Sequence, residues 1–293
     1  MGGFFMEMKP DIELEEISCP LCEASKGTPI HRESSFQMVR CPSCQFIYLN
    51  PRPTNEALFH FYQDYLPEEA SSIESWQKMM QPVFKRAVHL LQKYKGKGRL
   101  LDVGAGFGFF LSEMKSRGWE VVGVEISQKA IEYARDVLEV IIQRGPLGTI
   151  GFPGNHFDVV TAFYVIEHVP DPMAFLEECH RVLKPGGLLM LRYPHTTPIK
   201  SLLRLLGIEN RFYGLPAHLS DFSPEMIQRC LEKVGFESCQ HRIGGHTHPN
   251  GLGKRTASSL FGNLSEALFY LSMKKFLLPG VSKTVFAFKE DRK

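Results

Sequence analysis

The stretch LLDVGAGFGFF, residues 100–110, joins an apolar strand, a glycine-rich turn and the start of a helix. In an open α/β sheet, such a junction is where a nucleotide-like cofactor lies against the backbone. The dinucleotide fingerprint G-x-G-x-x-G would need a glycine at position 109, where this chain has Phe109. The stretch therefore argues against a pyrophosphate cradle. It predicts a turn that a bulky group approaches closely, because its glycines carry no side chain.

A carboxylate follows this turn at the distance expected for a ribose-binding residue. The β-branched segment EVVGVE, residues 120–125, ends in Glu125, about 20 residues after the first glycine. A carboxylate accepts several hydrogen bonds, so it can hold both hydroxyls of a ribose. We therefore interpret residues 100–125 as a nucleoside-cofactor site. The alternative is a glycine turn that serves only helix–sheet packing.

Strand-like and helix-like patterns alternate through the centre of the chain. Short apolar or β-branched runs are separated by segments with helical spacing. Such alternation predicts a parallel sheet with right-handed crossovers, and therefore an α/β, doubly wound, Rossmann-like fold. The expected strands span 99–103, 120–124, 139–142, 157–163 and 187–193, and the expected helices span 107–117, 128–137, 172–183 and 224–234.

Four motifs, in this order, resemble those of class I S-adenosylmethionine-dependent methyltransferases. They are DVGAGFG at 102–108, Glu125, FDVV at 157–160 and LKPGG at 183–187. The resemblance covers roughly residues 98–195. It implies a seven-stranded, mostly parallel sheet whose last strands, near 236–243 and 283–289, form an antiparallel pair at the edge.

The resemblance also implies S-adenosylmethionine as the cofactor. The three glycines of the turn would lie under its methionine and ribose parts, Glu125 would hold the ribose hydroxyls, and Asp102 would sit near the methionine end. Segment 145–152 departs from the family pattern, which often has an acidic residue there for the adenine amino group, so that contact is left unassigned. The implied cofactor-binding residues are Asp102, Gly104, Ala105, Gly106, Gly108, Glu125 and Ile126.

Composition and charge favour an ordinary globular chain. It has 293 residues, 43% of them hydrophobic, and a net charge of +2, which gives no electrostatic argument for binding nucleic acid. Residues 1–17 contain five carboxylates and no apolar core of a signal peptide. The sequence contains no run of about 20 apolar residues, so it predicts no membrane-spanning helix. We expect a cytoplasmic protein, with peripheral contact to the inner membrane face left open.

Two C-x-x-C pairs predict a structural zinc site. Cys19 and Cys22 are separated by 18 residues from Cys41 and Cys44, a spacing typical of four thiolate ligands on a zinc ribbon. A segment of about 40 residues cannot form an adequate core, so the Zn²⁺ would contribute its folding energy. A redox pair is the alternative, but two matched pairs without a surrounding βαβ unit argue against it.

The N-terminal module is acidic rather than basic. Residues 1–55 carry five Lys and Arg against seven Asp and Glu, a balance of −2. Because phosphate binding relies on a cationic surface, this module is expected to be structural or substrate-gating rather than a nucleic-acid reader.

The predicted organisation has three parts: a zinc-ribbon-like module at 1–55, a helical lid or linker at 56–95, and a methyltransferase domain at 96–293. Thr54 is expected to cap a helix over 56–62, and a second helix is expected over 73–94. The domain contains a helical insert at about 244–282 with apolar residues on several sides. Either it packs on the domain or on a partner subunit of a homo-oligomer, or it contacts lipid.

Three histidines are the candidate catalytic residues. Methyl transfer to a hydroxyl benefits from a general base. His168 and His195 follow the carboxyl ends of predicted strands, and His218 lies ahead of the helix expected at 224–234. The alternative for each is a loop histidine bonded to backbone. The Glu167–His168 pair resembles that of ubiquinone-pathway O-methyltransferases. Some of these have an earlier glutamate that completes a metal site, where this chain has Tyr164, so the resemblance does not carry a catalytic metal over.

These observations favour a methyltransferase acting on oxygen of a small-molecule, glycan or lipid-linked acceptor. A nucleic-acid or protein methyltransferase guided by the zinc module is the second hypothesis. The acidic module and the sequence AFYV at 162–165, in place of an Asn/Asp-Pro-Pro-aromatic motif, count against the nucleic-acid form. A non-catalytic protein that only binds the cofactor is the third.

Overall fold

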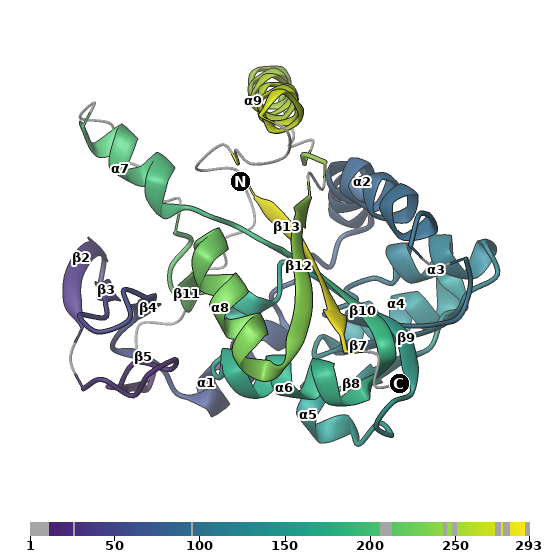
Figure 1. The fold of residues 1–293 in the computed structure, drawn as a ribbon, viewed down its shortest axis with the longest axis horizontal. Coiled ribbons are helices and arrows are strands. Elements are labelled where there is room, and N and C mark those ends of the chain that lie inside the picture. Colours follow the sequence, from purple (N-terminus) through teal and green to yellow (C-terminus); the bar gives the residue numbers. More distant parts are fainter. Residues whose placement is uncertain are drawn as a thin grey trace.

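A seven-stranded sheet lies at the centre of the structure (Figure 1). The structure is a computed structural model that describes residues 12–25, 27–94, 96–205, 213–242, 245–247, 251–272, 277 and 282–290. The sheet order is β12-β13-β10-β9-β6-β7-β8. Its strands are β6 (Arg99–Val103), β7 (Glu120–Glu125), β8 (Ile142–Arg144), β9 (Phe157–Phe163), β10 (Leu183–Tyr193), β12 (Phe236–Arg242) and β13 (Lys283–Lys289).

The pairing directions confirm the predicted fold class. Strands β8, β7, β6, β9 and β10 run parallel, and β13 runs antiparallel between β10 and the outermost strand β12. Two strand starts were wrong. β10 begins at Leu183 instead of 187, because Leu183 already pairs with Phe157 of β9 ahead of a register shift. β8 begins at Ile142 instead of 139. Glu139 ends the preceding helix with φ 54°, and the N–H of Val140 still donates to the Ala134 carbonyl, so these residues complete the helix end.

Helices cover both faces of the sheet. Apolar residues of α5 (Leu147–Ile150), α6 (Pro172–Val182) and α8 (Pro224–Val234) pack in one core cluster. Residues of α2 (Ala70–Gln92), α3 (Phe109–Ser116) and α4 (Gln128–Leu138) pack in the other. Side-chain caps begin α4 and α8, where Ser127 and Ser223 accept hydrogen bonds from backbone N–H groups of the first turn.

The N-terminal module is joined to the methyltransferase fold through a shared sheet and a shared core. Strands β2 (Thr28–Glu33), β3 (Phe36–Arg40) and β4 (Ile47–Leu49) continue into β11 (Ser220–Asp221). β1 (Leu14–Glu15) pairs with β5 (Arg52–Pro53). Cys19, Cys41 and Phe46 lie in the same core cluster as α6 and α8. The module therefore has apolar support beyond its own 40 or so residues, which the sequence did not predict.

Helix α1 (Asn55–Gln63) follows the module, and Thr54 caps it as predicted, accepting from the Ala57 N–H. A short 3-10 helix, η1 (Ile166–His168), follows β9.

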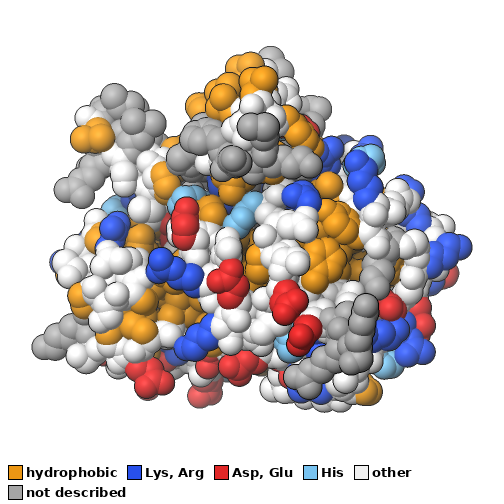
Figure 2. All heavy atoms as spheres, in the orientation of Figure 1, with side chains coloured by type: hydrophobic (Ala, Val, Ile, Leu, Met, Phe, Trp, Pro, Cys, Tyr) orange, Lys and Arg blue, Asp and Glu red, His pale blue; other side chains and the backbone are white. Residues whose placement is uncertain are grey.

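The predicted insert between β12 and β13 contains α9 (Leu252–Leu271), and α7 (Thr197–Leu205) follows β10. Figure 2 shows hydrophobic side chains gathered over α9, at the top of the view. No helix within the described parts of the chain is long and apolar enough to cross a membrane. Lipid contact and self-association through α9 stay predictions. Vesicle flotation tests the first, and analytical sedimentation tests the second. Among the α9 side chains that the structure describes, the large exposed apolar ones are Leu260, Phe261, Leu264, Tyr270 and Leu271.

Candidate active site

The glycine turn connects β6 to α3 in a backbone conformation that side chains disfavour. Gly104 has φ 68° and Gly106 has φ 52°. A Cβ atom on Gly104 would lie 2.4 Å from Val165 Cγ2, so glycine is required there. The N–H groups of Gly104 and Ala105 donate to the Val124 carbonyl at 2.8 and 3.0 Å. Gly104 stays exposed, so the turn presents bare backbone to a ligand, as the sequence predicts.

Glu125 lies beside this turn, at the end of β7. Its Oε2 accepts from the Gly106 N–H at 2.8 Å, and its Oε1 accepts from Ile126 and Ser127 at 2.7 and 3.1 Å. Burial raises the pKa of Glu125, and the three backbone donors oppose that shift. Since a carboxylate has about four lone-pair positions, one remains for a ribose hydroxyl.

Asp102 is the buried carboxyl directly before the glycine turn. It is 2% exposed, and Thr161 Oγ1 donates to its Oδ1 at 2.6 Å. Burial raises the pKa of Asp102 to about 7. A cationic group close to this carboxyl would favour its ionised form.

Residues of the predicted lid lie over the turn. A Cβ on Gly106 would lie 3.5 Å from Trp76 Cη2 and 3.8 Å from Leu66 Cδ1. The Trp76 ring also contacts the Phe107 ring, with centroids 5.6 Å apart. After β8, the Gly145 N–H donates to the Glu125 carbonyl at 3.0 Å.

His168 closes η1, at the carboxyl end of β9. Its Nδ1 lies 2.7 Å from the Ala217 carbonyl oxygen, which can only accept, so Nδ1 carries the proton and Nε2 has a free lone pair. Burial lowers the pKa of His168 to about 4, so the ring is neutral near pH 7. The neutral ring can therefore accept a proton at Nε2, although its lowered pKa makes it a weaker base than an exposed histidine.

Glu167 and His218 flank His168. The rings of His168 and His218 are 4.9 Å apart, and His218 is 8% exposed. Glu167 is 1% exposed, neither of its carboxyl oxygens has a hydrogen-bond partner among the described residues, and burial raises its pKa to about 8. The ligand atoms of these three residues lie within 4.8 Å of one another, close enough to hold a cation. The sequence offered Glu167 and His168 as a pair, and the structure adds His218 as a third neighbouring ligand group.

His195 belongs to a different cluster. Its Nδ1 is buried without a partner among the described residues, and burial, with Lys283 nearby, lowers its pKa to about 4. Lys283 and Glu225 also act on His241, whose Nε2 lies 3.3 Å from Tyr193 Oη. Of the three predicted histidines, the structure thus brings together His168 and His218.

Two tyrosines missed by the sequence reasoning hold His168 from α1 and the residues after it. The Tyr62 and Tyr65 rings meet the His168 ring edge-on, with centroids 5.4 and 5.7 Å away. Tyr62 Oη donates to the Ala217 carbonyl at 2.7 Å, the same oxygen that accepts from His168. Tyr62 lies in a short amphipathic helix and Tyr65 just after it, and neither position gave a sign of this role.

A buried arginine was also missed. Arg192 lies in an apolar strand, β10, and is 1% exposed. It donates to Tyr164 Oη at 2.8 Å, to Thr284 Oγ1 at 3.1 Å and to the Gly245 carbonyl at 2.8 Å. Tyr164, at the position where the family resemblance raised the question of a metal-binding glutamate, thus accepts a hydrogen bond from Arg192.

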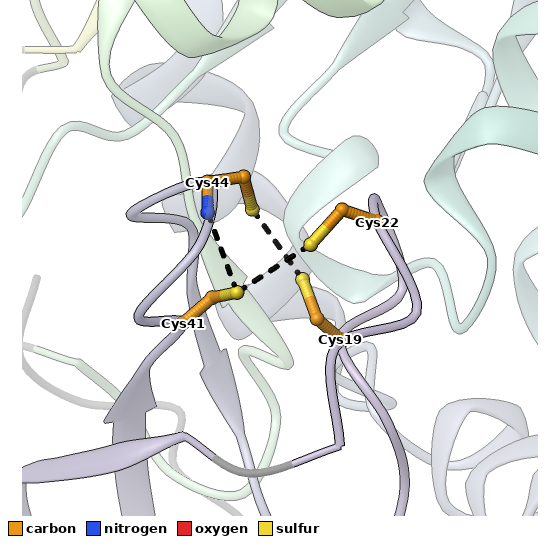
Figure 3. A group of neighbouring side chains, drawn as sticks. All are labelled: Cys19, Cys22, Cys41 and Cys44. Carbon is orange, nitrogen blue, oxygen red and sulfur yellow. Dashed lines mark hydrogen bonds between the residues drawn. The ribbon is translucent and has the colours of Figure 1, made fainter.

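The four predicted cysteine ligands converge on one point (Figure 3). Cys19 Sγ lies 3.5 Å from Cys44 Sγ, and Cys22 Sγ lies 3.5 Å from Cys41 Sγ. All four sulfurs lie within 4.8 Å of one another. A tetrahedral zinc ion with Zn–S distances of about 2.3 Å separates its sulfurs by about 3.8 Å, so the cluster fits such an ion.

Comparisons with known proteins agree with this geometry. Residues 76–241, more than half of the chain, match the profile of the methyltransferase domain family. The ubiquinone biosynthesis O-methyltransferase of Ruegeria pomeroyi is 32% identical over 148 residues, which are 47% of this chain and 60% of that protein. The enzyme of the same name from Leptothrix cholodnii is 28% identical over 170 residues, 52% of this chain and 68% of that protein.

Solved structures share the fold. Phosphoethanolamine N-methyltransferase 2 of Haemonchus contortus, in complex with S-adenosylmethionine, has a TM-score of 0.55 and 17% identity, covering 83% of this chain and 63% of that one. A SAM-dependent methyltransferase of Thermotoga maritima has a TM-score of 0.53 and 18% identity, covering 79% and 100%. The chain spans only about 60% of the first curated relatives. The chain therefore belongs to the methyltransferase domain family, with the class I S-adenosylmethionine-dependent methyltransferase fold.

Proposed function

We propose that this protein transfers a methyl group from S-adenosylmethionine to a hydroxyl oxygen of a small-molecule acceptor. The observation that carries the proposal is the neutral His168, whose Nδ1 is fixed by the Ala217 carbonyl and whose Nε2 is free to accept a proton. The names of the curated relatives, ubiquinone biosynthesis O-methyltransferases, support oxygen as the methylated atom.

The chain's own residues supply positioning and proton transfer. The glycine turn and Glu125 would hold the cofactor, which brings an activated methyl group on a sulfonium. Displacement at that methyl needs alignment of the acceptor oxygen more than chemical activation. His168 Nε2 would take the hydroxyl proton, and the Ala217 carbonyl would stabilise the imidazolium through Nδ1.

We further propose that Cys19, Cys22, Cys41 and Cys44 hold a structural Zn²⁺, since four converging thiols fit its preferred coordination. The ion would hold the N-terminal module in place and take no part in methyl transfer. Elemental analysis of the purified protein tests this, with one zinc per chain as the expected result.

A pH profile with S-adenosylmethionine and a panel of phenolic, sugar and lipid hydroxyl acceptors tests the catalytic proposal. Because burial lowers the pKa of His168 to about 4, protonation of this histidine is expected to lower turnover only below about pH 5. Asp102 and Glu167, whose pKa values burial raises to about 7 and 8, titrate above that range, so the profile is repeated with Asp102→Asn and Glu167→Gln. Folding is followed by circular dichroism at each pH. A midpoint near 6.5, the ordinary value of histidine, that persists in both variants would contradict a buried base. Methylation of amines alone would contradict oxygen as the target.

A further inference from the structure

We infer that the four-cysteine module positions the acceptor side of the active site, so that its metal controls the placement of His168 while leaving the cofactor side unaffected. The inference about catalysis rests on the proposed role of His168. The structural coupling on which it depends can be measured without any turnover.

The first link is the sheet that crosses from the module into the methyltransferase fold. Strand β4 pairs with β11, with Tyr48 opposite Ser220 and Ile47 opposite Asp221. The Leu49 N–H also donates to the Leu219 carbonyl at 2.8 Å. Segment 217–222 is thus held as an added edge of the module's own sheet.

The second link joins the cysteines to that sheet. Cys41 and Cys44 lie in the turn between β3 and β4, where the Cys41 N–H donates to the Phe46 carbonyl at 2.8 Å. The Phe46 ring packs on the Phe222 ring, with centroids 4.9 Å apart. A metal on these thiols therefore fixes the turn of the β3–β4 hairpin, and strand β4 of this hairpin pairs with segment 217–222.

The third link runs from this segment to His168. The Leu219 N–H donates to the Glu167 carbonyl at 2.7 Å, and the Ala217 carbonyl accepts from His168 Nδ1 at 2.7 Å. Ala217 to Phe222 are all buried, none more than 8% exposed. The segment therefore has little freedom to move independently of the strand on one side and η1 on the other.

Two further contacts tie the module to the same region. Arg52 donates to the Pro170 carbonyl at 2.8 Å, just after η1. The Asp221 carboxylate accepts from the Thr196 and Thr197 N–H groups at 2.7 and 2.8 Å, which holds the chain after β10. The glycine turn, by contrast, is held by Val124 and Glu125 of β7. Metal loss should therefore loosen one side of the site and spare the other.

Hydrogen–deuterium exchange on the full chain tests the inference. The metal-loaded protein is compared with chelator-treated protein and with Cys22→Ser, and metal content is measured for each. Peptides that cover 166–170 and 215–222 are expected to exchange at least about tenfold faster without metal, whereas those covering 100–125 change less than about twofold. Calorimetric affinity for S-adenosylhomocysteine is expected to change by less than about twofold.

Two more variants keep the test decisive. Cys239→Ser removes a half-buried cysteine outside the cluster and should leave exchange unchanged. Phe46→Leu keeps all four thiols, and it should retain metal while residues 215–222 exchange several-fold faster. Faster exchange confined to residues 12–50, equal acceleration at 100–125, or absence of metal from the purified protein would each overturn the inference. If the coupling is found but turnover does not depend on His168, the proposed function fails and the coupling stands.

Discussion

The cofactor side and the acceptor side of this site are built in different ways. The glycine turn, Asp102 and Glu125 come from neighbouring strands β6 and β7, and backbone N–H groups hold Glu125 and the turn together. His168 depends instead on the Ala217 carbonyl, 49 residues further along the chain. Tyr62, which donates to the same carbonyl, lies 155 residues before Ala217. The first side is a local structure, while the second is assembled by packing of distant segments. Substitutions on the two sides should therefore change different measured quantities.

The largest expected effect is that of His168→Ala. Loss of a general base lowers turnover by roughly 100-fold, and cofactor affinity should stay within about twofold because Glu125 and the turn are untouched. Single-turnover kinetics and calorimetry measure the two quantities. His60→Ala, an exposed histidine on α1, is the control. Equal losses of turnover and cofactor affinity would make His168 a structural residue and remove the distinction between the two sides.

The next effect should have the opposite pattern. Glu125→Ala removes the acceptor of three backbone N–H groups, so cofactor affinity is expected to fall by about 10- to 100-fold. Turnover at saturating cofactor should remain within a few-fold of the original value. Glu120→Ala, at the exposed start of the same strand, is the matched control. Unchanged affinity in Glu125→Ala would mean that the carboxylate serves only the turn.

The same contrast explains what could be predicted from the sequence. The glycine turn and Glu125 were predictable because the strand, the turn and the carboxylate follow one another within about 25 residues. Most strand positions were predictable for the same reason. The start of β8 was placed too early because residues 139 and 140 belong to the end of α4. The four cysteines were found because metal-ligand spacing is itself a local signal.

The acceptor side was only partly predictable. His168 was named from its place after a strand and His218 from its place ahead of a helix, but nothing in the sequence indicated that they would meet while His195 would not. Arg192 lies in the apolar second half of β10, at 188–193, and Tyr62 lies in a helix whose pattern resembles an ordinary packing face. Their roles arise from contacts between remote segments, which local periodicity does not report.

A substitution at the boundary between the two sides should have an effect of intermediate size. A Cβ on Gly104 would lie 2.4 Å from Val165, three residues before His168, and the residue has φ 68°. Gly104→Ala is therefore expected to lower the free energy of unfolding by about 1–3 kcal/mol, as measured by urea titration. Gly148→Ala has open space around the added methyl group and should change stability by less than about 0.5 kcal/mol. Equal stabilities for the two variants would mean that the Val165 side chain moves aside for the added methyl group.

The smallest expected effect is the most specific, because Tyr62→Phe removes one hydroxyl and keeps the ring against His168. The Ala217 carbonyl then loses the donor at 2.7 Å that helps to aim it at His168 Nδ1. A net hydrogen bond of about 0.5–1.5 kcal/mol corresponds to a roughly two- to twelvefold lower turnover, with cofactor affinity unchanged. Tyr65→Phe, which changes the neighbouring ring in the same way, serves as the control. If turnover in Tyr62→Phe equals that of the control, the carbonyl is held by β11 and β4 alone. The alignment of His168 would then come from the N-terminal module rather than from α1.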